Sequence, residues 1–171
     1  MDEEVAKRFR RIASNATDAL SNDAAGLNNV LQVAVNLCEH LETLGIPFSI
    51  IGGIAVQRWG EPRQTVDVDA TLFVGFGNEG DAVRRLLKKF QSRIEDAHEF
   101  ALQNRILLLR ADQGTAIDLS LGGLPFEERL IERSSVWSVP RHGHIHPAVP
   151  KTLSCSKHSP ADHRTGSTSK K

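Results

Sequence analysis

Two aspartates separated by a single residue are the part of the chain best suited to chemistry. Asp67 and Asp69 lie in the segment TVDVDAT, where polar and apolar residues alternate. Successive side chains of a β-strand point to opposite faces, so both carboxylates are expected on one face. Neighbouring carboxylates repel each other, and a divalent cation such as Mg²⁺, which prefers carboxylate oxygens, removes that repulsion. The spacing predicts a metal site; the solvated face of an ordinary strand is the alternative.

A third carboxylate interrupts a second apolar segment, TAIDLSL. In an extended strand Ile117 and Leu119 point to one face and Asp118 to the other. Burial of an unpaired charge is costly, and a metal shared with Asp67 and Asp69 would remove that cost. The alternative is an edge strand on which Asp118 faces water.

A glycine pair precedes the acidic segment. Gly52 and Gly53 follow the apolar run FSII, and glycine lets the backbone come close to an anion with its N–H groups free to point at it. A helix that begins at Gly53 would direct its first N–H groups at a phosphate. Arg63 lies just before the acidic segment, where it can bind a phosphate or pair with Asp67. We expect a nucleotide-binding turn here, formed by Gly52, Gly53 and Arg63.

Hydrophobic periodicity predicts the elements that position these residues. Apolar residues recur at helical spacing from Leu27 to Leu44, and Gly45 and Pro47 end that helix. Strands are expected over residues 48–51, 65–71, 105–110, 115–121 and 135–139, with helices over 54–59, 81–90 and 124–133. Val66, Val68, Ala70 and Leu72 are expected to face the core, as are Phe126 and Leu130 of the last helix. The predicted class is α/β (α+β), a mixed sheet flanked by helices.

The composition divides the chain into three regions. Residues 1–26 are expected to form a helix and a loop, residues 27–140 one domain, and residues 141–171 a disordered tail, because the last stretch has too few apolar residues to bury a core. His142, His144 and His146 alternate at the start of this tail. Three imidazoles on one strand face can bind zinc, but a second element that supplies ligands is missing.

Charge and cysteine content limit the partners. The 171 residues carry 21 basic and 21 acidic side chains, so no overall field attracts nucleic acid or membrane. Local contact with RNA is still open to the basic face of the helix over 81–90, although such a face is commonly just solvated. The two cysteines, Cys38 and Cys155, suggest no disulfide framework, and Cys38 belongs to the apolar stripe of its helix. With no apolar signal region and no membrane-length apolar run, the protein is expected to be cytoplasmic.

The order of these features resembles the signature of the nucleotidyltransferase superfamily, which has the polymerase-beta-like fold. That signature is an apolar strand, Gly-Gly, a short helix and then a strand with Asp-x-Asp, and Asp118 matches the later strand that supplies the third carboxylate. The phrases GEPRQTVDVD and LPFEE are most similar to the AbiEii/AbiGii-type toxins and related minimal nucleotidyltransferases. The resemblance covers about residues 47–140.

The resemblance implies transfer of a nucleotide from a nucleoside triphosphate to an RNA, with tRNA ends as one option, or to a protein acceptor. It implies two Mg²⁺ ions held by Asp67, Asp69 and Asp118 as catalytic residues, and a cognate antitoxin protein as a partner. Relatives continue into a further helix that this chain lacks after Pro140. The hypothesis is that the C-terminal part is missing or frameshifted, and the alternative function is a truncated, non-catalytic relative that binds nucleotide or a partner. An adaptor that uses the basic helix is a third option.

Overall fold

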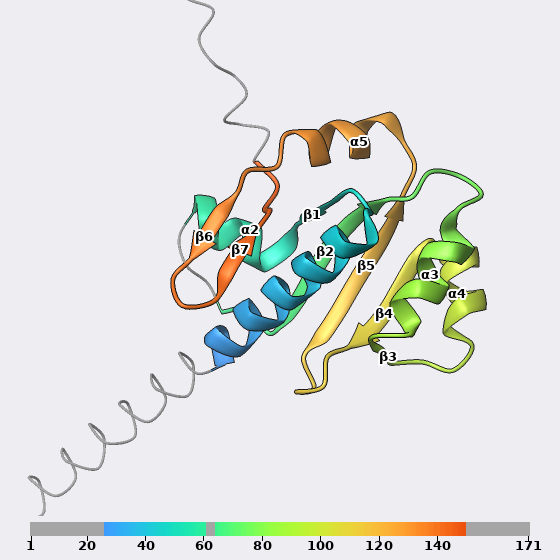
Figure 1. Cartoon of the computed structure of the whole chain (residues 1–171), viewed down its shortest axis with the longest axis horizontal. Helices are drawn as coiled ribbons and strands as arrows, with labels where there is room; N and C mark the ends of the chain where they lie inside the picture. The colour runs from blue at the N-terminus through green and yellow to red at the C-terminus, as the bar shows by residue number, and fades with distance from the viewer. Residues whose placement is uncertain (1–25, 61–63, 150–171) are drawn as a thin grey trace, which may run out of the picture.

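A five-stranded mixed sheet with helices packed on it forms the body of the protein (Figure 1). The computed structural model describes residues 26–60 and 64–149. The described chain begins with a helix over residues 26–44. The other elements are β1 (Phe48–Ile50), α2 (Gly52–Trp59), β2 (Asp67–Phe73), α3 (Glu79–Leu87), β3 (Gln91–Ser92), α4 (Ala97–Asn104), β4 (Ile106–Arg110), β5 (Ala116–Gly122), α5 (Pro125–Glu132), β6 (Trp137–Val139) and β7 (Gly143–Ile145). The predicted mixed α+β class is confirmed.

The strand order of the sheet is β1-β2-β5-β4-β3. The central pair, β2 and β5, runs parallel, while β1–β2, β5–β4 and β4–β3 are antiparallel. The two acidic strands, β2 and β5, lie side by side in the sheet. In sequence they are separated by α3, β3, α4 and β4. Parallel strands require such a crossover, and this one contains helices, as expected.

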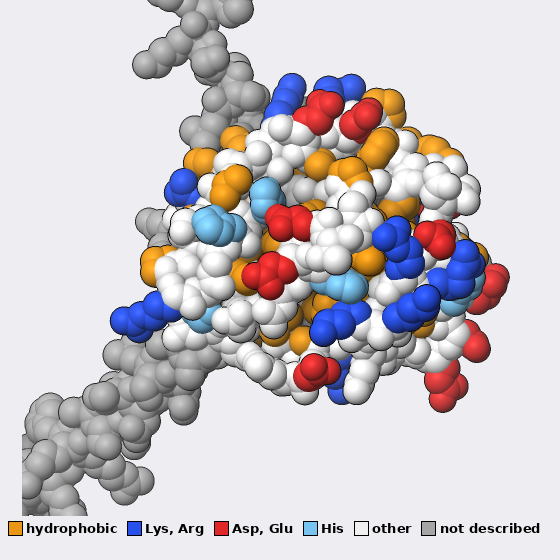
Figure 2. All heavy atoms as spheres, viewed as in Figure 1, with side chains coloured by type: hydrophobic (Ala, Val, Ile, Leu, Met, Phe, Trp, Pro, Cys, Tyr) orange, Lys and Arg blue, Asp and Glu red, His pale blue; other side chains and the backbone are white. Residues whose placement is uncertain are grey.

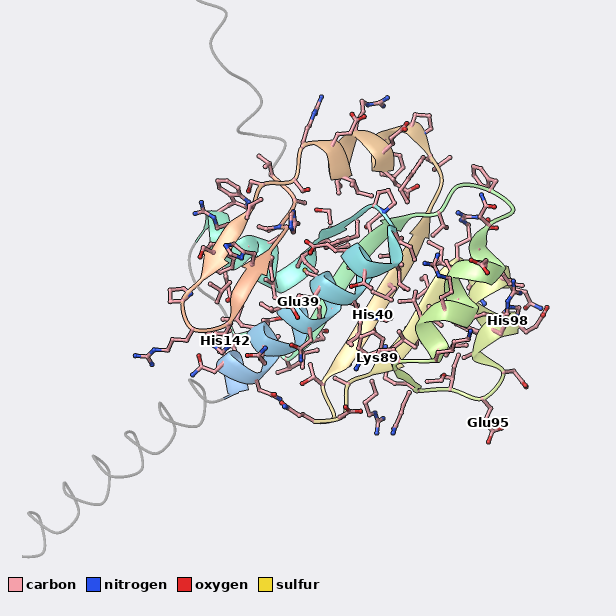
Figure 3. The ribbon with its side chains drawn as sticks, viewed as in Figure 1. Glu39, His40, Lys89, Glu95, His98 and His142 are labelled. Carbon is pink, nitrogen blue, oxygen red and sulfur yellow. The ribbon has the colours of Figure 1, made fainter. Side chains whose placement is uncertain are left out.

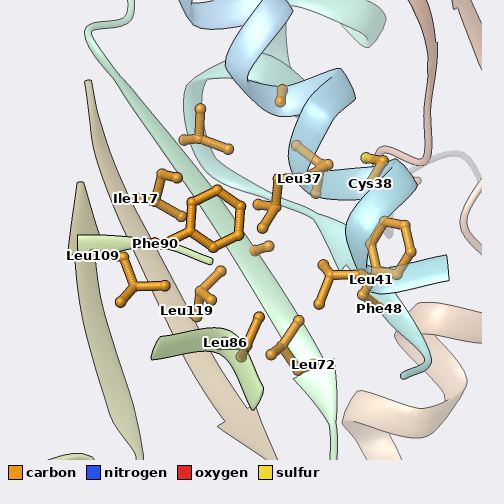
Figure 4. Close-up of a cluster of buried hydrophobic side chains, with 14 of the residues drawn as sticks. Leu37, Cys38, Leu41, Phe48, Leu72, Leu86, Phe90, Leu109, Ile117 and Leu119 are labelled. Carbon is orange, nitrogen blue, oxygen red and sulfur yellow. The ribbon is translucent and has the colours of Figure 1, made fainter. Parts of the chain in front are cut away.

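One face of the sheet builds the core. Val68, Leu72, Ile117 and Leu119 are fully buried beneath the helix over residues 26–44 and α3. Figure 4 shows Leu37 and Leu41 of that helix and Leu86 of α3 in one cluster with the strand residues Leu72, Ile117 and Leu119. Alternation along β2 and β5 leaves the other face polar and half-buried.

Three expected core positions, Val66, Phe126 and Leu130, are not buried. Val66 is 70% exposed because β2 begins one residue later, at Asp67. Phe126 is 56% exposed, and no residue of α5 is buried. The helix over 124–133 therefore forms close to its predicted position, but it does not insert Phe126 into the core.

A hairpin of β6 and β7 follows α5 and continues the fold past residue 140. Val139 and Ile145 of this hairpin are buried. The N–H of Ile50 donates to the carbonyl of His146, and the N–H of Ala148 donates to the carbonyl of Ile50, both at 2.8 Å. The expected start of the tail at residue 141 thus falls inside an ordered element. Of the helix and loop predicted over residues 1–26, all but residue 26 lies outside the described residues, as does the remaining tail over 150–171.

Within the described residues, no helix has both the length and the apolar content that crossing a membrane requires.

Candidate active site

The register of β2 and β5 brings the predicted carboxylates onto one face of the sheet. Asp69 is the direct partner of Asp118 in the parallel pair, and Asp67 pairs with Ala116, two residues before Asp118 on the same face. Val68 and Ile117, the pair between them, point to the core. Because paired residues on neighbouring strands point to the same side, the face opposite the core carries all three acidic side chains.

The glycine turn lies against Asp69. Gly52 has a φ of +63°, and a Cβ built on it would overlap with Asp69 Oδ2, so only glycine fits without a shift. The N–H of Ile51 donates to the Asp69 carbonyl at 2.9 Å. Helix α2 begins at Gly52, with no side chain capping it and no acidic residue in its first turn. Its positive end therefore lies next to the acidic face, where an anion would be favoured.

Gly53 makes room for Thr65, because a Cβ on Gly53 would overlap with Thr65 Oγ1. That hydroxyl lies 3.2 Å from Asp67 Oδ1 and donates to it. In this structure the glycine pair accordingly packs against Asp69 and Thr65, the latter of which orients Asp67. The sequence prediction gave the pair only a role in phosphate binding and did not identify Thr65.

Asp118 has a partner that sequence reasoning missed. Arg93 Nη2 forms an ion pair with Asp118 Oδ1, and the two side chains are 25% and 39% exposed. The N–H of Arg93 donates to the carbonyl of Leu108 at 3.1 Å, and Leu108 is the register partner of Asp118. Arg93 directly follows β3, a strand of only two residues, which is too short to be found from periodicity.

The acidic face offers oxygen ligands for a divalent cation at Asp67 and Asp69. Among the described residues, no group of three or more His, Cys, Asp or Glu side chains is arranged to hold a metal ion. Asp67 and Asp69 still offer the hard oxygen ligands that Mg²⁺ prefers, and the glycine at position 52 lets the Asp69 carboxylate lie against the backbone of the turn. Asp118 already has the positive charge of Arg93.

The remaining candidates from the sequence are Arg63, the histidines and Cys38. Arg63 lies outside the described residues. His142 contacts Gln32 Oε1 at 3.0 Å and His146 contacts Glu42 Oε1 at 3.1 Å, so the two side chains are engaged with the helix over residues 26–44 and not with a shared ion. Burial raises the pKa of Cys38 to about 12, consistent with its predicted place in the core.

A pocket of about 410 Å³ lies between the helix over 26–44, which covers the core face of the sheet, and the residues that follow α3. His40 and Lys89 line it, together with Glu39 and Asp112; Figure 3 shows His40 and Lys89 close to each other at this place. Its charges are of both signs. We assign the candidate site to the acidic sheet face instead, where the register of β2 and β5 brings Asp67, Asp69 and Asp118 together.

The basic face of α3 is partly neutralised. Arg84 and Arg85 both pair with Asp81, at 3.6 and 3.8 Å, and Arg85 also donates to the Leu44 carbonyl at 2.7 Å. Figure 2 shows basic and acidic side chains interspersed over this side of the molecule. Within the described chain, α3 therefore offers a weaker polyanion surface than its sequence indicates.

No family model matches the chain, and no curated protein matches it. Among solved structures, the chain is similar to the crystal structure of an antigenic nucleotidyltransferase-like protein from Paracoccidioides brasiliensis, with a TM-score of 0.46 and 19% identity over 70% of this chain and 61% of that one. It is also similar to the lincomycin-bound lincosamide antibiotic adenylyltransferase LnuA, with a TM-score of 0.36 and 12% identity over 65% of this chain and 64% of that one. The chain spans less than two thirds of the length of either protein.

Proposed function

We propose that this protein is a metal-dependent nucleotidyltransferase, which moves a nucleoside monophosphate from a nucleoside triphosphate to the hydroxyl of an acceptor. The observation that carries the proposal is the shared sheet face of Asp67, Asp69 and Asp118, with Asp69 and Asp118 in direct register. The uncapped start of α2 beside Asp69 supports it, because it favours a bound phosphate.

The residues have distinct tasks in this proposal. Asp67 and Asp69 would hold Mg²⁺, with Thr65 orienting the Asp67 carboxylate, and Asp69 with Asp118 would hold a second ion. A metal held there would neutralise phosphate charge and lower the pKa of the attacking hydroxyl. The turn at Gly52 and Gly53, with the start of α2, would contact the triphosphate beside Asp69, and Arg63 is a further candidate for phosphate contact. The hydroxyl oxygen bonds to the α-phosphorus, its proton passes to solvent, and pyrophosphate leaves.

The resemblance of the sequence to AbiEii/AbiGii-type toxins extends the proposal to the acceptor and the setting. An RNA, with tRNA ends as one option, or a protein is the acceptor, a cognate antitoxin protein is a partner, and the cytoplasm is the compartment.

The test compares the wild-type chain with the Asp67→Asn and Asp69→Asn variants. Each is incubated with radiolabelled nucleoside triphosphates, Mg²⁺ and total RNA. Both substitutions keep the side-chain volume but remove a charge that binds the metal, so transfer should fall by at least about 100-fold. A Ser138→Ala variant, altered at an exposed position of β6, is the control and should transfer as the wild type does. Unchanged transfer in both aspartate variants would contradict the mechanism.

One observation favours a second function, a non-catalytic relative that binds nucleotide. The Asp118 carboxylate is occupied by Arg93, and the described residues lack a group of three or more ligands arranged for a metal. Calorimetry separates the two functions: nucleotide binding in the presence of Mg²⁺, with no transfer of label to RNA or protein, identifies the non-catalytic form.

A further inference from the structure

The ion pair of Arg93 and Asp118 is built into the fold. The backbone N–H of Arg93 is fixed to Leu108 next to Asp118. Ser92 closes the turn at the neighbouring residues, because its hydroxyl donates to the Ile94 carbonyl at 2.7 Å and accepts from the Ile94 N–H at 3.1 Å. A short turn, stabilised by the Ser92 side chain, thus holds the Arg93 guanidinium on the acidic face.

The ion pair with Asp118 does not use every hydrogen-bond donor of the Arg93 guanidinium. Arg93 Nε is buried and has no hydrogen-bond partner among the described residues. An arginine has several donors in a fixed planar fork, which matches the oxygens of a phosphate as well as those of a carboxylate. The Arg93 side chain is still 25% exposed, so an incoming anion can reach the guanidinium.

A guanidinium and a divalent cation compete at Asp118. Both would use the same carboxylate, and like charges a few ångströms apart repel. We propose that Arg93 is the resident cation of Asp118, so that a second divalent ion binds there only after a polyphosphate has drawn the guanidinium away. This inference rests on the proposed function and adds an order of binding to it: the triphosphate arrives with one ion at Asp67 and Asp69, and Asp118 becomes available afterwards.

Manganese binding to the full chain without nucleotide tests the first half. Electron paramagnetic resonance measures the free aqueous Mn²⁺ that remains as each variant is titrated. Arg93→Gln should bind Mn²⁺ at least about tenfold more tightly than the wild type, because the competing charge is gone. Arg93→Gln/Asp118→Asn should lose this gain, and Arg93→Lys should stay near the wild type. Arg84→Gln, which removes an exposed charge on α3, is the matched control and should change nothing.

Binding of ATP in the presence of EDTA tests the second half. Without metal, the affinity for ATP should depend on the contact of Arg93 with phosphate. It should fall at least about fivefold in Arg93→Gln and stay at the wild-type value in Arg84→Gln. Circular dichroism checks that each variant is folded. If Arg93→Gln binds ATP as the wild type does, Arg93 does not respond to phosphate and this half is overturned.

The outcomes separate this inference from the function on which it rests. If Arg93→Gln binds Mn²⁺ like the wild type while Asp69→Asn binds it more weakly, the role of Arg93 is overturned and the transferase proposal stands. If neither Asp67→Asn nor Asp69→Asn alters Mn²⁺ binding, both are overturned.

Discussion

At the scale of single residues, Gly52 and Asp69 occupy neighbouring space on the acidic face. The positive φ of Gly52 is one constraint, and the Asp69 carboxylate beside its α-carbon is a second. Gly45, which follows the helix over 26–44, has nearly the same φ, +66° against +63°, but nothing lies within 4 Å of the Cβ that a substitution would add. An alanine at Gly45 would therefore suffer backbone strain alone, whereas an alanine at Gly52 would suffer the same strain and also overlap with Asp69.

Gly45→Ala should lower the free energy of unfolding by about 1–2 kcal/mol, the cost of a left-handed backbone for a residue with a Cβ. Gly52→Ala should cost a further amount of about 1–3 kcal/mol, because the new methyl group overlaps with Asp69. Urea denaturation of both variants measures the difference. Equal losses in the two would mean that the contact with Asp69 carries no energy.

Part of this residue-level picture could be predicted from the sequence. The period of two in TVDVDAT and TAIDLSL is enough to put each aspartate opposite the core, because the apolar positions between them must be buried. The contact of Arg93 with Asp118 could not be predicted, since it depends on the pairing of β3 with β4 and of β4 with β5. No local pattern encodes such pairings.

At the scale of elements, β5 holds the site together because it pairs with β2 on one side and β4 on the other. Its core face carries Leu119, fully buried, and its opposite face carries Asp118. The same strand thus contributes to stability and to the candidate site through alternate residues.

Leu119→Ala should lower the free energy of unfolding by about 2–5 kcal/mol, the usual cost of a cavity in a packed core. Ile106→Ala, on β4 and 40% exposed, is the control and should cost about 1 kcal/mol or less. Chemical denaturation followed by tryptophan fluorescence gives both values. A loss at Leu119 as small as the loss at Ile106 would mean that this face is not the core.

The elements were predictable to different degrees. The helix that ends at residue 44, the acidic strand and the central strand β5 have long apolar patterns, and the structure contains all of them. The first strand of the β6–β7 hairpin lies within the strand predicted over residues 135–139. Its second strand was not predicted, because it buries only Ile145 among histidines and the turn depends on the positive φ of Arg141 and Gly143. Short strands with a single buried residue give no periodic signal.

At the scale of the whole molecule, two of the described side chains link the free energy of unfolding to pH on the acidic side. Burial of the imidazole, followed by the nearby charges of Lys89 and Arg85, lowers the pKa of His40 below its ordinary value of 6.5. The N–H of Glu79 itself, assisted by Arg105 and by the N–H of Gly77, lowers the pKa of Glu79 below its ordinary value of 4.5. In both cases the unfolded chain takes up the proton at a higher pH than the folded chain does.

The free energy of unfolding should therefore fall in two steps as the pH is lowered, first below 6.5 through His40 and then below 4.5 through Glu79. His40→Gln should flatten the first step, and Glu79→Gln the second. His144→Gln, at an exposed position of β7, serves as the control and should leave the first step in place. Thermal unfolding across this pH range measures the steps, and an unchanged first step in His40→Gln would refute the assignment.

The bridge between Ile50 and Pro147 has a consequence for association. A border strand with open N–H and C=O groups is a template for uncontrolled growth of a sheet. Here one border, β1, is screened by the segment that follows β7, through the bonds between Ile50 and residues 146 and 148, and the other border, β3, has only two residues. A chain truncated at residue 140 would expose the free edge of β1, and we expect it to aggregate into fibres. The segment after the hairpin would thus protect the protein from aggregation.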